Sequence, residues 1–391
     1  MQKTRYEQDT LQKLIENFHI YGEFVQAVPM GPGNINQTFL LTMDQAGSHV
    51  RYVLQRINNT VFHEPDKLMD NYVRVTKHLC QKYKSRDTLD ISRRYIQLIH
   101  TGDGRGKAMC PYFIDEDGHY WRCYFHIERV FSLEKVTRIQ HTHAAAAAFA
   151  RFQKDLSDLE NGPNLYPTIP QFHDIRLRYK QLEEAISEDV AGRVAEVQAE
   201  ILFYRQRRDA YCILEELREK GVLPVRVCHN DTKISNILID EHSGEGIAVI
   251  DLDTVMPGIV LYDFGDLART SLSNSMEDEV DIQRIHARME HFRAMAEGFL
   301  REWGDSLEDA EVDLLAFAPR VMTLIIGLRF LTDYLCGDVY FKTHSAEQNL
   351  DRTRTHMALV TSMEEQEEQM KKIVTDVVAE LNLGYFRRRA P

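Results

Sequence analysis

The stretch VCHNDTKISNILID, residues 227–240, decides how the rest of the chain is interpreted. Within eight residues it holds four chemically different side chains, His229, Asp231, Lys233 and Asn236. The apolar runs on either side predict short strands. A third such run, GIAVI at 246–250, ends in Asp251-Leu-Asp. Both polar groups therefore fall at strand ends, where loop side chains converge on a site.

These side chains meet the requirements of phosphoryl transfer. An acceptor hydroxyl must be oriented and relieved of its proton, which a carboxylate such as Asp231 can do. Mg²⁺ prefers hard oxygen ligands, and Asn236 and Asp251 offer an amide and a carboxylate oxygen from adjacent strand ends. Lys233, two residues after the base, would stabilise charge on the transferring group. The pattern predicts a kinase-type site with one base and two metal ligands.

Other interpretations of the same residues are weaker. A lone HxD string is common, and a metallohydrolase would need further ligands beside His229 and Asp231. His141 and His143 are candidates by residue type, but their alanine-rich stretch predicts a helix in which they pack or face solvent. The combination of HxDxxxxN with a strand-terminal IDxD is far more specific than either part, and it favours the kinase-type site.

The chain has 391 residues, a length that predicts two lobes or domains. Its first part contains short strand-like runs, a helix beginning at Pro65 and an aromatic-rich hairpin; the strands are expected at 24–30, 37–43, 50–58 and 93–100, and the hairpin at 110–130. From about residue 137 the pattern is helical, with Gly221 as an expected helix C-cap. Later helices are expected at 277–302, 308–336 and 360–382. We therefore expect an α+β protein with a small antiparallel β N-lobe at 1–127 and a mostly helical C-lobe at 128–391.

Composition narrows the choice of partners. The formal charge of −13 argues against a nucleic-acid or anionic-membrane partner. None of the six cysteines forms a CxxC pair, so reduced thiols are expected. The N-terminus lacks the apolar segment of a signal peptide, and no stretch approaches a membrane span. These features predict a cytoplasmic protein; its oligomeric state is not encoded in any motif, and a monomer is compatible with the sequence.

The chain resembles the aminoglycoside phosphotransferase and choline kinase superfamily, on the motif at 229–236 followed by VIDLD at 249–253 and LYDFGD at 261–266. That resemblance implies a two-lobed protein-kinase-like fold that uses ATP and Mg²⁺. It makes Asp231 the catalytic base and Asn236 and Asp251 the magnesium ligands, and it matches Asp263 to a later aspartate of the family. FHIERV at 125–130 stands where an interlobe hinge is expected, so backbone groups near Glu128 and Val130 would meet adenine.

Two features depart from the kinase pattern. The loop MGPGNINQTF has Gly31 and Gly33 but lacks the third glycine of G-x-G-x-x-G, so Asn34 and Asn36 would supply side-chain donors instead. A phosphate-binding lysine is missing from RYVLQRIN at 51–58. Arg56 is the candidate replacement, with Gln55 on the opposite face as the competing alignment. The acidic partner on the following helix is one of Glu64, Asp66 and Asp70.

Longer stretches resemble the N-acetylhexosamine 1-kinases; they lie at 54–71, 169–179, 229–240, 249–266 and 327–344. This resemblance implies transfer to the anomeric hydroxyl of N-acetylglucosamine or N-acetylgalactosamine, with Arg329 and Tyr340 contacting the sugar. Arg329 and Asp333 would offer forked hydrogen bonds to a neutral polyol. Arg329 could instead pair with Asp333 one helical turn on. Choline, homoserine and aminoglycoside kinases are the alternative enzymes, and a non-catalytic nucleotide-binding regulator is the alternative from another class.

Overall fold

A computed structural model describes residues 6–31, 35–86, 88–102 and 109–385. Gly33 and Asn34, predicted to contact phosphate, lie outside the described residues. The chain divides into two compact units. Unit 1 comprises Met1–Val130 and Tyr166–Ile169, and unit 2 comprises Phe131–Leu165 and Pro170–Pro391. The predicted α+β class, with an antiparallel sheet followed by a helical part, is confirmed.

Unit 1 is built on one antiparallel sheet in the order β1-β2-β3-β6-β4, with β5 also paired to β6. Its strands are β1 (Glu23–Pro29), β2 (Gln37–Gln45), β3 (Ser48–Arg56), β4 (Leu98–Ile99), β5 (Phe113–Ile114) and β6 (Tyr120–Phe125). Its helices are α1 (Gln8–Ile15), α2 (Pro65–Ser85) and the short η1 (Ile91–Arg93). Pro65 suits the first turn of α2, where its missing N–H is not needed.

The two faces of this sheet carry different side chains, because neighbouring residues of a strand point to opposite faces. On one face, Leu54 of β3 and Cys123 of β6 join a buried apolar cluster that includes α1. On the other face, Gln55 of β3 stands opposite Arg122 of β6. The Arg122 guanidinium stacks on the ring of Tyr72 from α2. Helix α2 therefore meets the sheet on the Gln55 face.

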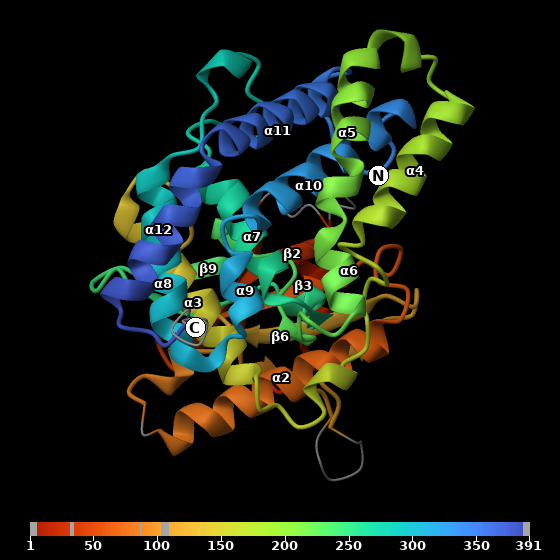
Figure 1. The fold of residues 1–391 in the computed structure, drawn as a ribbon. Coiled ribbons are helices and arrows are strands. Elements are labelled where there is room, and N and C mark those ends of the chain that lie inside the picture. The colour runs from red at the N-terminus through yellow and green to blue at the C-terminus, as the bar shows by residue number, and fades with distance from the viewer. Residues whose placement is uncertain (1–5, 32–34, 87, 103–108, 386–391) are drawn as a thin grey trace. The chain divides into compact units, whose positions relative to one another are not determined.

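Unit 2 is mostly helical (Figure 1). Its longer helices are α3 (Ile139–Leu156), α4 (Ile175–Glu188), α5 (Gln198–Tyr211), α6 (Ile213–Glu219), α7 (Val260–Leu272), α8 (Met289–Trp303), α9 (Asp309–Asp313), α10 (Ala318–Leu335), α11 (Gln348–Glu365) and α12 (Glu367–Glu380). The predicted β insertion consists of two antiparallel pairs, β8 (Arg226–Cys228) with β11 (Met256–Gly258) and β9 (Ile237–Asp240) with β10 (Gly246–Val249). Strand β7 (Val130–Phe131) spans the point where the chain passes from unit 1 to unit 2.

The alanine run at 144–148 lies in α3 and packs tightly. Ala145 and Ala146 of α3 are fully buried. A Cβ added to Gly298 of α8 would lie 2.5 Å from the carbonyl oxygen of His143, so α3 and α8 touch backbone to backbone there. Gly221 has a φ of 70° just after α6, as expected for a residue that ends a helix in the left-handed conformation.

Four predicted elements differ from the structure. The helix expected at 360–382 covers the last turns of α11 (Gln348–Glu365) and then α12 (Glu367–Glu380). The strand expected at 93–100 pairs only at Leu98–Ile99, because Arg93 donates to the carbonyls of Glu128 and Arg129 instead of entering the sheet. The helix expected from 277 begins at Met289, since the acidic residues before it offer no apolar face. The helix expected at 308–336 is two helices, α9 and α10, and Pro319 lies in the first turn of α10.

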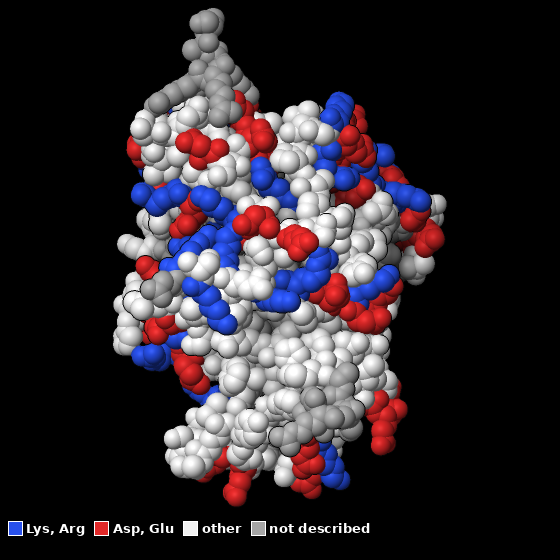
Figure 2. All heavy atoms as spheres, turned by 90° about the horizontal axis from the view of Figure 1, so that it is seen from below, with Lys and Arg blue, Asp and Glu red and all other residues white. Residues whose placement is uncertain are grey.

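No helix among the described residues is long and apolar enough to cross a membrane. The six cysteines are all free thiols. On the face drawn in Figure 2, Lys and Arg side chains have Asp and Glu side chains beside them. Pairs such as Arg205 with Glu183 and Arg176 with Glu219 show this mixing on the helices of unit 2.

Candidate functional site

Asp263, in the first turn of α7, holds the backbone of the HNDTK turn. Its carboxylate accepts the N–H of His229 and the N–H of Asn230, both at 2.7 Å. The side chain of Gln153 donates to the same carboxylate at 2.7 Å. Burial raises the pKa of Asp263 to about 6, so it is ionised at neutral pH and its full charge faces these donors. One carboxylate thus fixes the two residues that precede Asp231.

His229 is a structural member of the site. It is fully buried, with its ring beside those of Phe149 and Phe152. Its Nε2 lies 2.9 Å from the carbonyl oxygen of Ile250, and its Nδ1 lies 3.2 Å from the backbone N of Asp231. Since a carbonyl only accepts, Nε2 carries the proton and Nδ1 accepts from Asp231. His229 therefore orients the backbone of Asp231 rather than ligating a metal.

Asn230 completes the turn with a φ of 63°, a left-handed conformation that asparagine tolerates better than most residues. Its amide donates to the carbonyl oxygens of Thr254 and Met256. Its own carbonyl accepts from Nε2 of His173 at 2.9 Å. His173 lies just before α4, and sequence reasoning missed it because its partner is 57 residues away.

Asp231, Lys233 and Asn236 contact one another, as the spacing predicted. Lys233 Nζ lies 2.9 Å from Oδ2 of Asp231, and Asn236 donates to the same oxygen at 3.1 Å. Burial works to raise the pKa of Asp231, but the charge and the hydrogen bond of Lys233, together with other nearby positive charges such as that of Arg269, hold that pKa below its usual value. The charge of Asp231, helped by those of Asp251 and Asp266, raises the pKa of Lys233. At neutral pH the pair is a carboxylate and an ammonium.

The two predicted metal ligands lie at neighbouring strand ends. The backbone N–H of Ile250, next to Asp251, donates to the backbone carbonyl of Asn236 at 3.0 Å. Asp251 has a φ of 61° and is close enough for its charge to act on Lys233. The amide nitrogen of Asn236 is engaged by Asp231, so its Oδ1 is the atom that can face a cation. An amide oxygen and a carboxylate are ligands that fit Mg²⁺.

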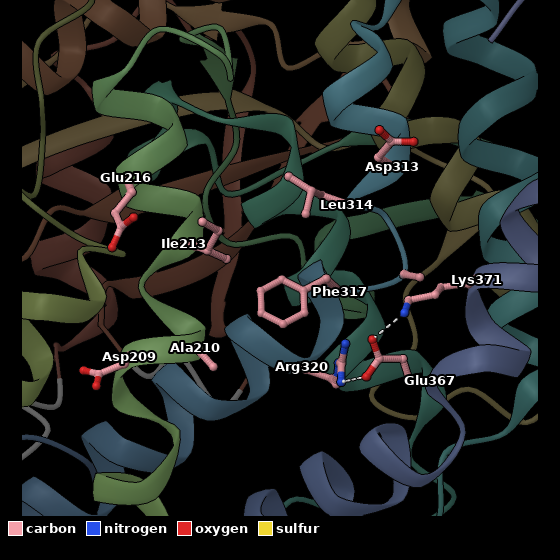
Figure 3. A pocket seen from close by; sticks show the side chains of 11 residues that line it. Asp209, Ala210, Ile213, Glu216, Asp313, Leu314, Phe317, Arg320, Glu367 and Lys371 are labelled. Atoms are coloured by element: carbon pink, nitrogen blue, oxygen red, sulfur yellow. Dashed lines mark hydrogen bonds and ion pairs between the residues drawn. The ribbon is translucent and has the colours of Figure 1, made fainter. Parts of the chain in front are cut away.

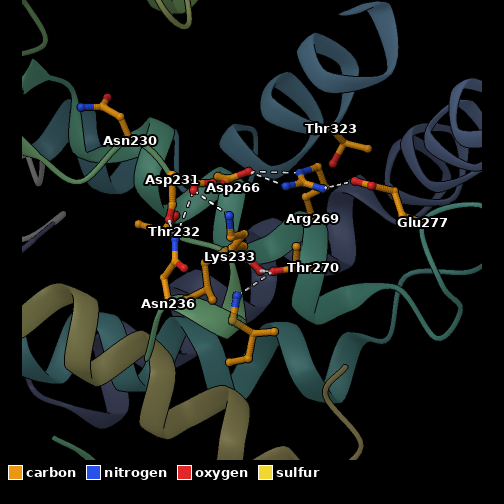
Figure 4. A network of polar contacts seen from close by, with 12 residues as sticks. Asn230, Asp231, Thr232, Lys233, Asn236, Asp266, Arg269, Thr270, Glu277 and Thr323 are labelled. Atoms are coloured by element: carbon orange, nitrogen blue, oxygen red, sulfur yellow. Dashed lines mark hydrogen bonds and ion pairs between the residues drawn. The ribbon is translucent and has the colours of Figure 1, made fainter. Parts of the chain in front are cut away.

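A second group of charged residues adjoins Asp231 and Lys233 (Figure 4). Arg269 of α7 donates to Oδ1 of Asp266 at 3.0 Å and to Glu277 at 2.7 Å. Asp266 is buried, and among the described residues its Oδ2 has no hydrogen-bond partner. Burial raises the pKa of Asp266. Asp266 therefore lies beside Asp231 and Lys233 as a second carboxylate held by its own arginine.

Arg329 of α10 lies within an aromatic cage. Its guanidinium carbon is 5.3 Å from the ring centroid of Phe172, and 5.4 Å from those of both Tyr340 and Phe341. Burial lowers the pKa of Arg329, and the charge of Asp231 works in the opposite direction, so the two side chains act on each other. Among the described residues Arg329 forms no ion pair with a carboxylate. Arg329 and Tyr340 are thus together, with Asp231 within electrostatic reach.

Asp333 does not have the role that the sequence suggested. Its carboxylate accepts the backbone N–H groups of Val339, Tyr340 and Phe341 at 2.8–3.0 Å, and Asn349 donates to it at 2.8 Å. Asp333 is only 5% exposed and does not pair with Arg329. It is a cap for the loop that follows α10, which carries Tyr340 and Phe341.

Arg178 of α4 is a further residue that sequence reasoning missed. Its Nη2 donates to the carbonyl oxygen of Phe172 at 2.6 Å, and its Nη1 to Gln181 at 2.9 Å. Burial, followed by the positive charge of Arg329, lowers the pKa of Arg178 to about 10. Two guanidinium groups therefore act on each other beside the cage, and Arg178 fixes the backbone of the residue that forms one wall.

Unit 1 holds the residues predicted to contact the nucleotide. Gly31 has a φ of 70°, and Asn36 accepts the backbone N–H of Asn58. Arg56 donates to the Tyr6 hydroxyl at 2.8 Å and to Gln37, on the sheet face that carries α1. The Glu128 side chain pairs with Arg51, and its carbonyl accepts from Arg93. Val130 begins β7, and its contact with adenine, like that of Glu128, stays a prediction.

A surface pocket of about 370 Å³ in unit 2 lies apart from these residues (Figure 3). Phe317, Leu314 and Ile213 form its apolar wall. Glu367, paired with Arg320 and Lys371, closes one end. None of its lining residues belongs to the Asp231 site or to the aromatic cage.

Solved structures share this fold. An aminoglycoside phosphotransferase from Alicyclobacillus acidocaldarius matches with a TM-score of 0.57 at 14% identity, over 98% of each chain. A choline kinase from Cryptosporidium parvum matches with a TM-score of 0.55 at 12% identity, over 94% of this chain and 98% of that one. A spectinomycin phosphotransferase in complex with ADP and spectinomycin matches with a TM-score of 0.54 at 11% identity, over 94% and 100%. At these identities the matches establish the two-part, protein-kinase-like fold.

The sequence itself identifies the family. The model of the phosphotransferase enzyme family, APH, matches residues 26–303, which is well over half of the chain. That range contains Asp231, Asn236 and Asp251 and the carboxylate of Asp263 that orders their turn. The chain belongs to the phosphotransferase enzyme family.

Proposed function

We propose that the protein is an ATP-dependent kinase that phosphorylates the anomeric hydroxyl of N-acetylhexosamines and releases the sugar 1-phosphate. The observation that carries the choice of acceptor is the Arg329 cage. A guanidinium without a carboxylate partner among the described residues, held by three aromatic rings, lies within electrostatic reach of Asp231. Such a group donates forked hydrogen bonds to hydroxyl and carbonyl oxygens, while an aromatic ring packs on the apolar face of a sugar.

The same cage argues against cationic acceptors. Choline is a quaternary ammonium ion and aminoglycosides carry protonated amines, which are bound by acidic side chains or by open aromatic faces. Here Phe172, Tyr340 and Phe341 already face the cation of Arg329. A second cation would meet the charges of Arg329 and Arg178 in a partly buried place, where repulsion is poorly screened. A neutral acceptor avoids this cost.

The geometry of unit 2 supports the remaining roles in this proposal. Asp231 accepts the proton of the anomeric hydroxyl, and it is ionised because Lys233 holds its pKa low. As that proton arrives, Lys233 is released from its partner and stabilises charge on the transferring group. Asn236 and Asp251 would hold Mg²⁺, which neutralises the phosphates of ATP when bound. Nucleotide binding falls to unit 1, in keeping with the ADP complex of the spectinomycin phosphotransferase.

The test is an ADP-release assay with ATP and Mg²⁺ across N-acetylglucosamine, N-acetylgalactosamine, glucose, galactose, choline, homoserine and kanamycin. Phosphorus NMR then identifies the product. Turnover of the acetamido sugars with an anomeric phosphate is the expected result. Turnover of choline, homoserine or kanamycin alone would overturn the choice of acceptor but keep the kinase. ATP binding without turnover of any compound would favour the non-catalytic regulator, which the absence of a lysine from β3 keeps open.

A further inference from the structure

Strand β3 has a polar but uncharged side chain where a kinase has its phosphate-binding cation. In protein kinases that cation is a lysine on the third strand, and it pairs with an acidic residue of the helix packed on the sheet. The β3 residue that faces the α2 side here is Gln55, and no acidic residue of α2 is paired with it. Glu64 pairs with Lys67, and Asp66 accepts from Tyr120.

A cation does occupy this face, but it comes from the next strand of the sheet. Arg122 of β6 stands directly opposite Gln55 in the register. Its Nε and Nη2 lie 2.9 Å and 2.5 Å from Oε1 of Gln55. Its guanidinium carbon is 4.5 Å from the ring centroid of Tyr72 on α2. The amide of Gln55 and the ring of Tyr72 thus hold the Arg122 guanidinium on the face of the sheet that α2 covers.

We propose that Arg122 is the residue of unit 1 that binds the phosphates of ATP, in place of the lysine that β3 lacks. The planar guanidinium suits two phosphate oxygens at once, which an ammonium does not. Gln55 and Tyr72 keep its plane fixed, so little side-chain entropy is lost on binding. Its Nη1 lies 4.0 Å from the sulfur of Met69 on the same helix, α2, as Tyr72.

The assignment replaces Arg56. That side chain projects from the other face of β3, where it donates to Tyr6 and Gln37 beside the α1 cluster. Arg56 is therefore a matched control, because it is an arginine on the adjacent residue of the same strand pairing, opposite Trp121. The inference rests on the proposed function only for the identity of the nucleotide, and its test needs no sugar.

The experiment measures ATP and adenosine binding by isothermal titration calorimetry in the full chain, with Mg²⁺ and without acceptor. For Arg122→Gln we expect ATP to bind about tenfold more weakly or worse, with adenosine little changed, since the proposed contact is with phosphate and not with the nucleoside. Arg56→Gln should leave both affinities within about twofold. The double variant Gln55→Lys with Arg122→Gln should recover most of the ATP affinity, because it returns a lysine to β3.

The overturning results are equally specific. Unchanged ATP affinity in Arg122→Gln, a selective loss in Arg56→Gln, or an equal loss of ATP and adenosine in Arg122→Gln would each refute the assignment. Should Arg122→Gln not fold, as judged by circular dichroism, Arg122→Lys serves in its place, with a smaller but still ATP-selective loss expected. Wild-type protein that binds ATP but phosphorylates no sugar would remove the proposed acceptor and leave Arg122 in place. Wild-type protein that binds no ATP would remove both.

Discussion

The HNDTK turn of unit 2 and the antiparallel sheet of unit 1 each position a cation, but they do so in different ways. Lys233 contacts Asp231 two residues away, and its partners are carboxylates. Arg122 contacts the amide of Gln55, 67 residues away, and stacks on the ring of Tyr72. The first arrangement is encoded in a continuous string of residues. The second exists only once the strands are paired in a particular register, so it cannot be seen as a motif.

The strongest way to test the first half of this comparison is Asp231→Asn. The substitution keeps the shape of the side chain and removes the proton acceptor, so kcat should fall by about 10²–10⁴-fold. ATP affinity, measured by calorimetry, should stay within about twofold, since the phosphate contacts of unit 1 are untouched. A variant that retains more than a tenth of the wild-type kcat would show that Asp231 is not the base.

Asp263→Asn tests whether the turn depends on one carboxylate. Asparagine offers a single acceptor to the N–H groups of His229 and Asn230 and turns a donor toward the other. We expect a loss of about 1–3 kcal/mol in the free energy of unfolding, together with a fall in kcat of about 10²-fold from a displaced Asp231. Urea unfolding and the ADP-release assay give the two numbers.

The matched control for that experiment is Asp240→Asn. Asp240 also accepts two backbone N–H groups in unit 2, those of His242 and Ser243, but in a turn that carries no site residue. It should lose stability without a comparable loss of kcat. Equal losses of kcat in both variants would mean that Asp263 contributes stability alone.

The HNDTK turn could be predicted because its residues are close in the sequence. The residues that sequence reasoning missed are those whose partners come from other parts of the fold. Asp231, Lys233 and Asn236 meet because they share one turn. Asp333 was expected to bind sugar. Its carboxylate instead accepts three backbone N–H groups from the loop that follows α10. His173 and Arg178 gave no sequence signal. His173 contacts the carbonyl of Asn230, 57 residues away, and Arg178 of α4 donates to the carbonyl of Phe172 in the segment before its helix.

The sheet of unit 1 also shows that a structural feature can depend on residues far apart in the sequence. The strands of unit 1 were largely predictable from their apolar and aromatic runs, and β1, β2 and β3 lie close to the expected ranges. Their faces were not, because a shift of one residue moves every side chain of a strand to the other face. The alternative between Gln55 and Arg56 was such a one-residue choice. The pairing of Gln55 with Arg122 and of Arg56 with Trp121 shows which of the two residues is on the α2 face of the sheet.

A smaller effect is expected at the loop that carries Tyr340. Asp333→Asn replaces one of the two acceptor oxygens that hold the backbone N–H groups of Val339, Tyr340 and Phe341, and so loosens this loop against Arg329. KM for the sugar should rise by about tenfold while KM for ATP is unchanged, because the loosened residues lie on the acceptor side. Steady-state kinetics with either substrate varied will separate the two. A parallel rise in both constants would count against a role in acceptor positioning.

The last prediction concerns the pH dependence of the free energy of unfolding. Burial lowers the pKa of His173 to about 3 and that of His356 to about 4, against about 6.5 in the unfolded chain. Between pH 6.5 and 4 the unfolded state binds protons that the folded state does not, so the free energy of unfolding falls as the pH falls. Each histidine contributes about 1.4 kcal/mol per pH unit in that window.

His356→Gln isolates one of these contributions at a residue of α11, outside the HNDTK turn. Glutamine can still donate to the carbonyl oxygen of Arg352, but it does not titrate. Urea unfolding at several pH values should show a shallower decline below pH 6.5 than in the wild type. An unchanged slope would show that His356 does not drive the acid sensitivity.

The residues that fix the aromatic cage, Arg178 and Asp333, suggest how the range of acceptors could be engineered. Phe172 stands on a short segment fixed from α4 by Arg178, and Tyr340 and Phe341 stand on a loop fixed from α10 by Asp333. The aromatic side chains of the cage could therefore be exchanged while the residues that fix their backbone, in α4 and α10, are kept. Libraries that diversify residues 172 and 339–341 while keeping both anchors should yield folded variants with new acceptors. Libraries that reach the backbone contact of α3 with α8 should mostly yield insoluble protein.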